Sequence, residues 1–180
     1  MPRLPDTIAP MTHPLVTQLR FTRAQFRRGI EGVTAEEAAR RFEPMNPIAW
    51  MVGHLAWHEQ LLWLDRAQNR IVAPELTQCG FGAPPSSPPI ADMWAAWRAV
   101  TEGADPYLDV LTPGLLLTHY ERDRRRPPEG IGTSLLRLTY HYWFHLGESQ
   151  AVRQLLGHRD LPTFVGEIGA EAPYAPEAGA

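Results

Sequence analysis

Residues 48–70, IAWMVGHLAWHEQLLWLDRAQNR, form a long and largely apolar stretch that contains no proline. Asn46 and Pro47 stand directly before it. An Asn side chain accepts hydrogen bonds from the free N–H groups of a first helical turn, and Pro suits the first helical position. The sequence therefore predicts a long helix from Pro47 to about Gln68, with Asn46 as its N-cap.

Two helices are predicted before this stretch. In residues 15–30 the apolar positions recur three, four and seven residues apart, with Arg between them, and Gly32 follows as a stop signal. Thr34 and Glu37 then have the spacing of a capping box. This pattern predicts a short second helix that ends near Phe42.

Proline and glycine divide the next part of the chain. Residues 73–89 are rich in Pro, Gly and Ser without any period, so we expect a long loop there. A helix is expected to run from Ile90 to about Val100, with Pro106 forcing a kink or a break after it. Residues 115–120 form a short segment that could be extended.

The last long helix is expected to begin with Thr133 as its cap and to end near Leu156, where Gly157 closes it. Residues 161–180 are rich in Gly, Ala and Pro, and we expect them to wrap the surface without forming a helix. Four long helical patterns and no convincing strand predict an all-α bundle. At 180 residues we expect a single domain over 1–180, with its core at about 12–160.

Composition excludes several function classes. A net charge of −3 and a pI near 6.2 argue against nucleic-acid and anionic-membrane partners. All 17 basic residues are Arg, so a lysine Schiff base is excluded. The single cysteine, Cys79, cannot form an internal disulfide, and we expect it to have no catalytic role. With no signal peptide and no apolar run long enough to span a membrane, we expect a cytoplasmic protein.

Four of the seven histidines occur as two HxxxH pairs, His54/His58 and His141/His145, each inside a predicted helix. Residues four apart on a helix lie one turn above each other, so two imidazoles can converge on one ion. A histidine on an apolar face is also often an ordinary hydrogen-bonded core residue. On spacing alone, metal binding and this core role are equally favoured.

The motifs of this chain resemble those of the DinB/YfiT-like superfamily, close to its DinB-type branch. The segments that carry the resemblance are NPIAWMVGHLAWHE, TYHYWFHLGESQAVRQLLGH, DLPTFVG and APYAPE, in that order. The resemblance implies an up-down four-helix bundle, often a homodimer. It also implies one metal ion held by His54, His141 and His145.

Other residues are candidates for supporting roles. His58, Glu59 and Glu148 lie beside the histidine motifs and are candidates for orienting a ligand, with the two glutamates also considered as bases. Trp57 and Tyr142 are candidates for lining a pocket over the metal. The Arg-rich loop has two interpretations, a carboxylate clamp or a solvated loop, and comprises Arg122, Arg124, Arg125 and Arg126.

The resemblance favours a metal-dependent transferase of the thiol (S-transferase) type, or a hydrolase, acting on a small molecule. The alternative is a non-catalytic bundle of the stress-response type, in which the metal is structural or a small ligand is bound. Zinc or nickel is the expected ion, with iron or manganese as further candidates, and a low-molecular-weight thiol is a candidate co-substrate. Net negative charge argues against a DNA-repair role.

Overall fold

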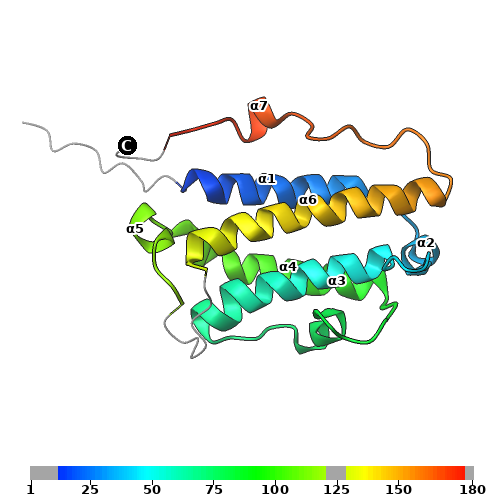
Figure 1. Cartoon of the computed structure of the whole chain (residues 1–180), viewed down its shortest axis with the longest axis horizontal. Coiled ribbons are helices and arrows are strands. Elements are labelled where there is room, and N and C mark those ends of the chain that lie inside the picture. The colour runs from blue at the N-terminus through cyan, green and yellow to red at the C-terminus, as the bar shows by residue number, and fades with distance from the viewer. Residues whose placement is uncertain (1–11, 121–128, 177–180) are drawn as a thin grey trace, which may run out of the picture.

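The computed structural model describes residues 12–120 and 129–176, and the regular structure within these two ranges is helical (Figure 1). No β-strand occurs in them, which confirms the all-α prediction. Within the same ranges no helix is both long and apolar enough to cross a membrane.

The first helix follows the sequence prediction closely, whereas the second ends at Ala39, before the predicted end near Phe42. Helix α1 spans Pro14–Ile30, and the short α2 spans Ala35–Ala39. The capping box is present: the Glu37 amide donates to the Thr34 hydroxyl, and the Glu37 carboxylate accepts from the Thr34 amide. Two otherwise unpaired N–H groups are satisfied in this way, which explains why so short a helix forms.

The long central helix begins one residue later than predicted. Helix α3 spans Ile48–Glu59, and its N-cap is Pro47, whose carbonyl accepts from the Met51 amide. The predicted cap, Asn46, therefore lies outside the helix. After Glu59 the chain continues as a π-helix, η1 (Gln60–Arg66), which the apolar period alone did not indicate.

The predicted loop at 73–89 contains a 3-10 helix, η2 (Pro74–Cys79). The Gln60 side chain holds the start of this segment, because its Oε1 accepts from the Val72 and Ala73 amides and its Nε2 donates to the Ala73 carbonyl. From there the connection runs back alongside α3 towards the start of that helix.

Helix α4 spans Ile90–Asp109, so it extends beyond the predicted end near Val100. It contains Pro106, so of the predicted kink or break at that residue the break is wrong. Pro106 lies in the last turn and removes only the hydrogen bond to the carbonyl of Glu102. Both residues are exposed, and water can satisfy that carbonyl. Proline is therefore tolerated at this position.

Helices α5 and α6 come next along the chain. Helix α5 spans Pro113–Leu116, and helix α6 spans Ile131–Leu155, with Gly130 as its N-cap. The predicted cap, Thr133, is wrong: it is an exposed residue inside α6. The helix starts earlier because Ile131 is buried and its amide donates to the Thr118 carbonyl. The predicted end is confirmed, with Gly157 at a φ of 89° just beyond it.

The C-terminal segment lies along the outer side of α1 (Figure 1). Gln18 donates to the Ala172 carbonyl at 2.8 Å, and Arg28 donates to the Thr163 carbonyl at 2.6 Å. The segment also contains one short helix, α7 (Ile168–Glu171), where none was predicted.

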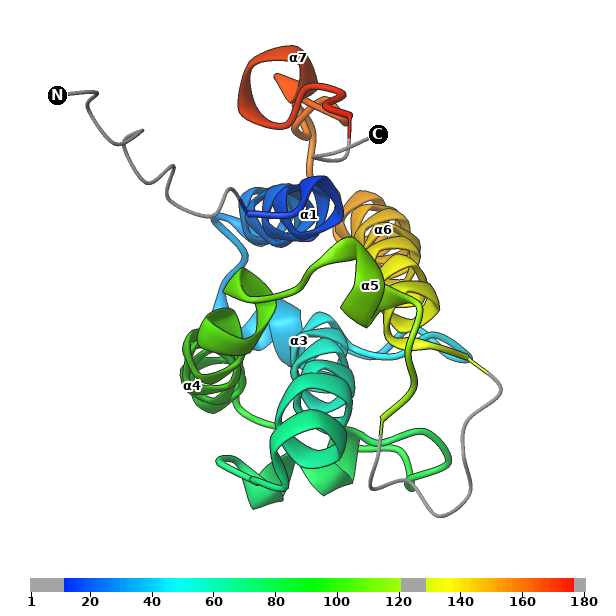
Figure 2. The same cartoon turned by 90° about the vertical axis from the view of Figure 1, so that its left-hand side faces the viewer.

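The four longest helices lie side by side, as the end-on view in Figure 2 shows. Gly53 of α3 lies against Met93 of α4, and Leu64 of η1 lies against Gly103 further along α4. Numbering increases in the same sense along both, so α3 and α4 run in the same direction, opposite to α1 and α6 (Figure 1). The directions of the four helices therefore do not alternate along the chain, as the predicted up-down arrangement requires. The reason is that residues 67–89 return the chain to the end of the bundle at which α3 starts.

A shared apolar core lies between these helices. Its fully buried side chains come from all four of them and include Leu19, Phe26, Met51, Leu55, Trp63, Met93, Leu108 and Leu135. Burial of this kind is the main source of stability in a helical protein of this size. It also fixes which faces of α3 and α6 meet.

Candidate metal centre

Three histidines converge where α3 and α6 pack together. His54 comes from α3, and His141 and His145 come from successive turns of α6. One donor atom from each lies within 4.8 Å of the others, and His54 and His145 are almost fully buried. This is the trio that the sequence pattern and the resemblance single out.

The outer ring nitrogen of each histidine is held by another group. His54 Nδ1 lies 2.7 Å from the Cys79 carbonyl, and His145 Nδ1 lies 2.8 Å from a Glu148 carboxylate oxygen. Both partners can only accept, so each Nδ1 carries the proton and each Nε2 keeps its lone pair. The Nε2 atoms of His145 and His141 are 3.0 Å apart. The inner ring nitrogens of the trio therefore lie close together.

His58 lies next to the trio rather than in it. Its Nδ1 is 2.8 Å from His141 Nδ1, so it takes the place that Cys79 and Glu148 take for the other two rings. All three ring orientations are thereby fixed by the protein.

Burial keeps the imidazoles of His54, His58 and His141 neutral. Desolvation lowers the pKa of His54 and of His58 to about 4, and that of His141 to about 3. A neutral imidazole is the form that coordinates a metal ion. At neutral pH a metal ion therefore displaces no proton from a charged ring of His54 or His141.

Two indoles lie parallel to the His54 ring. Trp50 stacks on it with a centroid distance of 4.4 Å and an interplanar angle of 12°, and Trp57 lies at 5.5 Å and 20°. Trp50 was not predicted from the sequence. Its position four residues before His54, on the same helical face, was the available signal.

A cavity of about 470 Å³ opens onto the trio. Its lining includes Trp50, His54, His141, Phe144, His145 and Glu148, together with residues of the 80–85 loop. A groove of about 660 Å³ continues past His141 and Phe144, lined also by His58, Leu136, Arg137 and Tyr140. Largely apolar walls around a few convergent polar groups are typical of small-molecule sites.

The sequence profile of the DinB superfamily matches residues 18–149. The chain belongs to the DinB superfamily. The match includes His54, His141 and His145, so the resemblance seen in the motifs is confirmed. No curated protein sequence matches the chain.

Tyr142 lies elsewhere in this DinB chain than predicted. It is fully buried, and its hydroxyl donates to Glu59 at 2.6 Å and accepts from the Trp97 indole at 2.7 Å. The prediction that it lines the pocket is wrong because a residue next to His141 points about 100° away around the helix. Burial raises the pKa of its hydroxyl well above the usual value, so it remains a donor.

The two glutamates beside the histidine motifs have different environments. Glu148 contacts His145, as described above. Glu59 is fully buried and paired with Arg23, so it neither orients a histidine directly nor lines the cavity. Its candidate role as a base at the metal is therefore not supported by its position.

The remaining candidates lie outside the centre. The Cys79 thiol is buried, and burial raises its pKa to about 11, so it is not an activated nucleophile. Its backbone, rather than its side chain, contacts a histidine. The predicted Arg cluster at 122–126 lies outside the described residues.

Proposed function

We propose that the protein binds one divalent metal ion through the Nε2 atoms of His54, His141 and His145, on a four-helix scaffold of the DinB type. The observation that carries the proposal is the convergence of three imidazoles whose outer ring nitrogens are already held by other groups. Such outer contacts fix the tautomer of metal-ligating histidines and raise their basicity.

The donor set favours zinc or nickel, with iron or manganese as further candidates. Three imidazole nitrogens suit borderline ions. Oxygen-preferring ions such as Mg²⁺ and Ca²⁺ would find one carboxylate among the described residues that line the cavity, Glu148, and His145 already occupies it. Three protein ligands leave a coordination position for water or for a thiol, whose pKa a bound ion lowers.

We therefore propose a metal-dependent transferase of the thiol type, or a hydrolase, with a small-molecule substrate. The cavity is large enough for a compact ligand, and the groove beside it offers the aromatic side chains of Tyr140 and Phe144, both about two-thirds exposed. A low-molecular-weight thiol is the proposed co-substrate. Glu148 would keep the proton on His145 Nδ1 throughout the reaction.

A non-catalytic role is the second candidate. Among the described residues that line the cavity, Glu148 is the one carboxylate, and it is engaged with His145. A structural or ligand-storing metal needs no further base. Thiol-conjugation assays with and without chelator separate the two roles, since a rate indifferent to chelation would exclude metal catalysis.

Metal content tests the proposal directly. Protein purified without a polyhistidine tag is expected to contain one equivalent of metal, and His141→Ala is expected to lose it. At a free metal concentration 100 times the Kd, the ion stabilises the folded state by about 2.7 kcal/mol, so chelation should lower the Tm of the wild type but not that of His141→Ala.

The half-buried His119, outside the trio, gives a matched control, and His119→Ala should keep both the metal and the chelator response. Stoichiometric metal in His141→Ala would refute the proposed ligands.

A homodimer in the cytoplasm is the accompanying proposal for the whole protein, and light scattering at several concentrations would measure the oligomeric state.

A further inference from the structure

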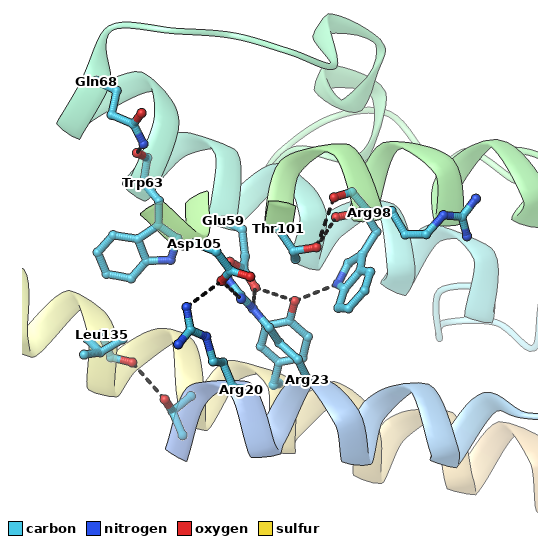
Figure 3. A network of polar contacts seen from close by, with 12 residues as sticks. Arg20, Arg23, Glu59, Trp63, Gln68, Arg98, Thr101, Asp105 and Leu135 are labelled. Carbon is cyan, nitrogen blue, oxygen red and sulfur yellow. Dashed lines mark hydrogen bonds and ion pairs between the residues drawn. The ribbon is translucent and has the colours of Figure 1, made fainter. Parts of the chain in front are cut away.

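A buried polar network ties the four long helices together (Figure 3), and two of its residues directly follow His58 and His141 in the chain. We call it the core network, and its members are Arg23 of α1, Glu59 of α3, Trp97 and Asp105 of α4, and Tyr142 of α6. Arg23 Nε donates to Glu59 Oε1 at 2.7 Å, and Arg23 Nη1 donates to Asp105 at 2.9 Å. A second contact joins Arg23 to the other Glu59 oxygen.

Burial makes this network a poor device for stability alone. Arg23 is 5% exposed and Glu59 is fully buried, so both charges have lost most of their hydration. The desolvation cost of such a pair commonly cancels its Coulomb attraction, and apolar replacements of similar volume often fold as well or better. What a fully satisfied buried network does supply is a single preferred arrangement of the elements that it joins.

The network and the histidines share the same helical turns. Glu59 directly follows His58, and Tyr142 directly follows His141. Two side-chain contacts therefore cross from α3 to α6 at one level, His58 to His141 at 2.8 Å and Tyr142 to Glu59 at 2.6 Å. Successive residues point about 100° apart, so the two contacts hold different faces of each helix. Rotation of either helix cannot preserve both.

The helix geometry also changes at this point. The α-helical part of α3 ends at Glu59, and the wider π-helical turn of η1 begins at Gln60. A change of helical type alters the rotation of everything beyond it. A fixed side chain at the junction keeps the preceding turns, which carry His54 and His58, in a defined orientation.

We propose that the core network is a positioning device for the metal centre: the Tyr142–Glu59–Arg23 contacts set the rotation of α3 against α6 so that His54 faces His141 and His145. The part of this inference that is tested by metal binding rests on the proposed function. None of the three residues touches the ion or lines the cavity; they act through the helices that carry the ligands.

Tyr142→Phe is the mildest test, because it removes one hydroxyl and keeps the ring. Thr139→Val is its matched control: this buried hydroxyl on α6 donates only to the Leu135 carbonyl of its own helix. We expect Tyr142→Phe to bind Co²⁺ about 10-fold more weakly than wild type, with altered visible d–d bands. Thr139→Val should match the wild type in Co²⁺ affinity and in the d–d bands, and its unfolding midpoint should be comparable.

A second variant removes both charges together. Arg23→Met combined with Glu59→Met leaves neither charge buried alone, and Asp105 keeps Arg20 as a partner at 3.3 Å. We expect a folded protein with an unfolding midpoint near that of wild type, yet with weaker Co²⁺ binding. Loss of affinity without loss of stability is the result that a purely structural network would not give.

A metal-free readout keeps this inference separate from the proposed function. In the apo protein, the imidazole ¹H–¹⁵N correlations of His54, His141 and His145 should shift in Tyr142→Phe and stay in place in Thr139→Val. If the wild type fails to bind Co²⁺, the proposed function falls, and these spectra alone decide the positioning role. Unchanged imidazole spectra in folded Tyr142→Phe, or unchanged Co²⁺ affinity and bands, would overturn it.

Discussion

Each histidine of the trio is oriented by a chemically different partner. A backbone carbonyl holds His54, a carboxylate holds His145, and a neutral imidazole holds His141. The carboxylate is the only charged partner of the three, so the contact of His145 with an ion should depend most on its outer partner. The bond to one ion would therefore be unequal across the three nitrogens.

Glu148→Gln tests this inequality. Glutamine can still accept from His145 Nδ1, but it lacks the negative charge. We expect metal affinity to fall about 10-fold, measured by competition with a chromophoric chelator. The exposed Glu102→Gln on α4 is the control and should bind as wild type does. Equal affinity in both variants would show that the charge of Glu148 has no influence on the ion.

At the residue scale, the sequence predicts what side-chain spacing encodes. Two HxxxH pairs and the family motifs single out His54, His141 and His145, and the structure brings these three together. The Cys79 contact could not be predicted, because a carbonyl leaves no trace in residue type. The prediction for Tyr142 is wrong because a residue next to His141 in sequence need not lie next to it in space: one helical step turns a side chain about 100° away.

At the scale of the elements, cap residues and prolines do not by themselves determine where a helix starts and ends. Asn46 and Thr133 are good cap residues, yet the helices start elsewhere, because Ile131 is pulled into the first turn of α6 by its burial. Proline is a strong helix breaker, yet α4 continues past Pro106 to Asp109. For Thr133, tertiary packing outweighed a cap preference of about 1 kcal/mol. Pro106 is tolerated for a different reason, because in the exposed last turn it removes only one hydrogen bond.

At Gly53 in α3, close packing should outweigh the preference of helices for alanine over glycine. A Cβ there would lie 2.5 Å from Met93 Sδ and 2.6 Å from Cys79 Sγ. Alanine normally gains up to about 1 kcal/mol over glycine in a helix, but such overpacking costs about 1 to 3 kcal/mol. We therefore expect Gly53→Ala to lower the free energy of unfolding in urea titrations.

The exposed Gly147 of α6 gives the matched control, since a Cβ there meets no atom within 4 Å. Gly147→Ala should raise the free energy of unfolding by the helix preference alone. A stabilised Gly53→Ala would contradict the close packing of α3 against Cys79 and Met93.

On the scale of the whole molecule, the direction of the helices depends on one connection. Residues 67–89 return along α3, so α4 starts beside the beginning of α3 and runs parallel to it. Apolar periodicity gives the existence and length of helices but not their direction. The connection is long enough for either arrangement, and the hydrogen bonds of Gln60 to residues 72 and 73 start its return.

Glu37 joins two distant parts of the chain, because its carboxylate contacts His158 beyond α6 as well as Thr34. The hydrogen bond from His158, with those from Thr34, lowers the pKa of Glu37 from 4.5 to about 2. A lowered folded-state pKa contributes stability above the unfolded value of about 4.5, and that stability is lost as pH falls towards 2.

Glu37→Gln should therefore have a lower Tm than wild type at pH 6. The difference should shrink between pH 4.5 and pH 2, as thermal unfolding followed by circular dichroism at each pH would measure. The exposed Glu36→Gln in the same helix should show no such pH-dependent difference. A constant gap between wild type and Glu37→Gln at all pH values would exclude ionisation of Glu37 as its cause.

The Cys79 carbonyl on His54 Nδ1 has an evolutionary consequence. Every amino acid offers a carbonyl at that position, so natural selection can keep this contact while the identity of the residue drifts. What cannot drift is size, because the Cys79 side chain sits against Gly53 and Met93. Among diverging sequences we expect position 79 to stay small and to co-vary in volume with positions 53 and 93, while the histidine it supports stays fixed.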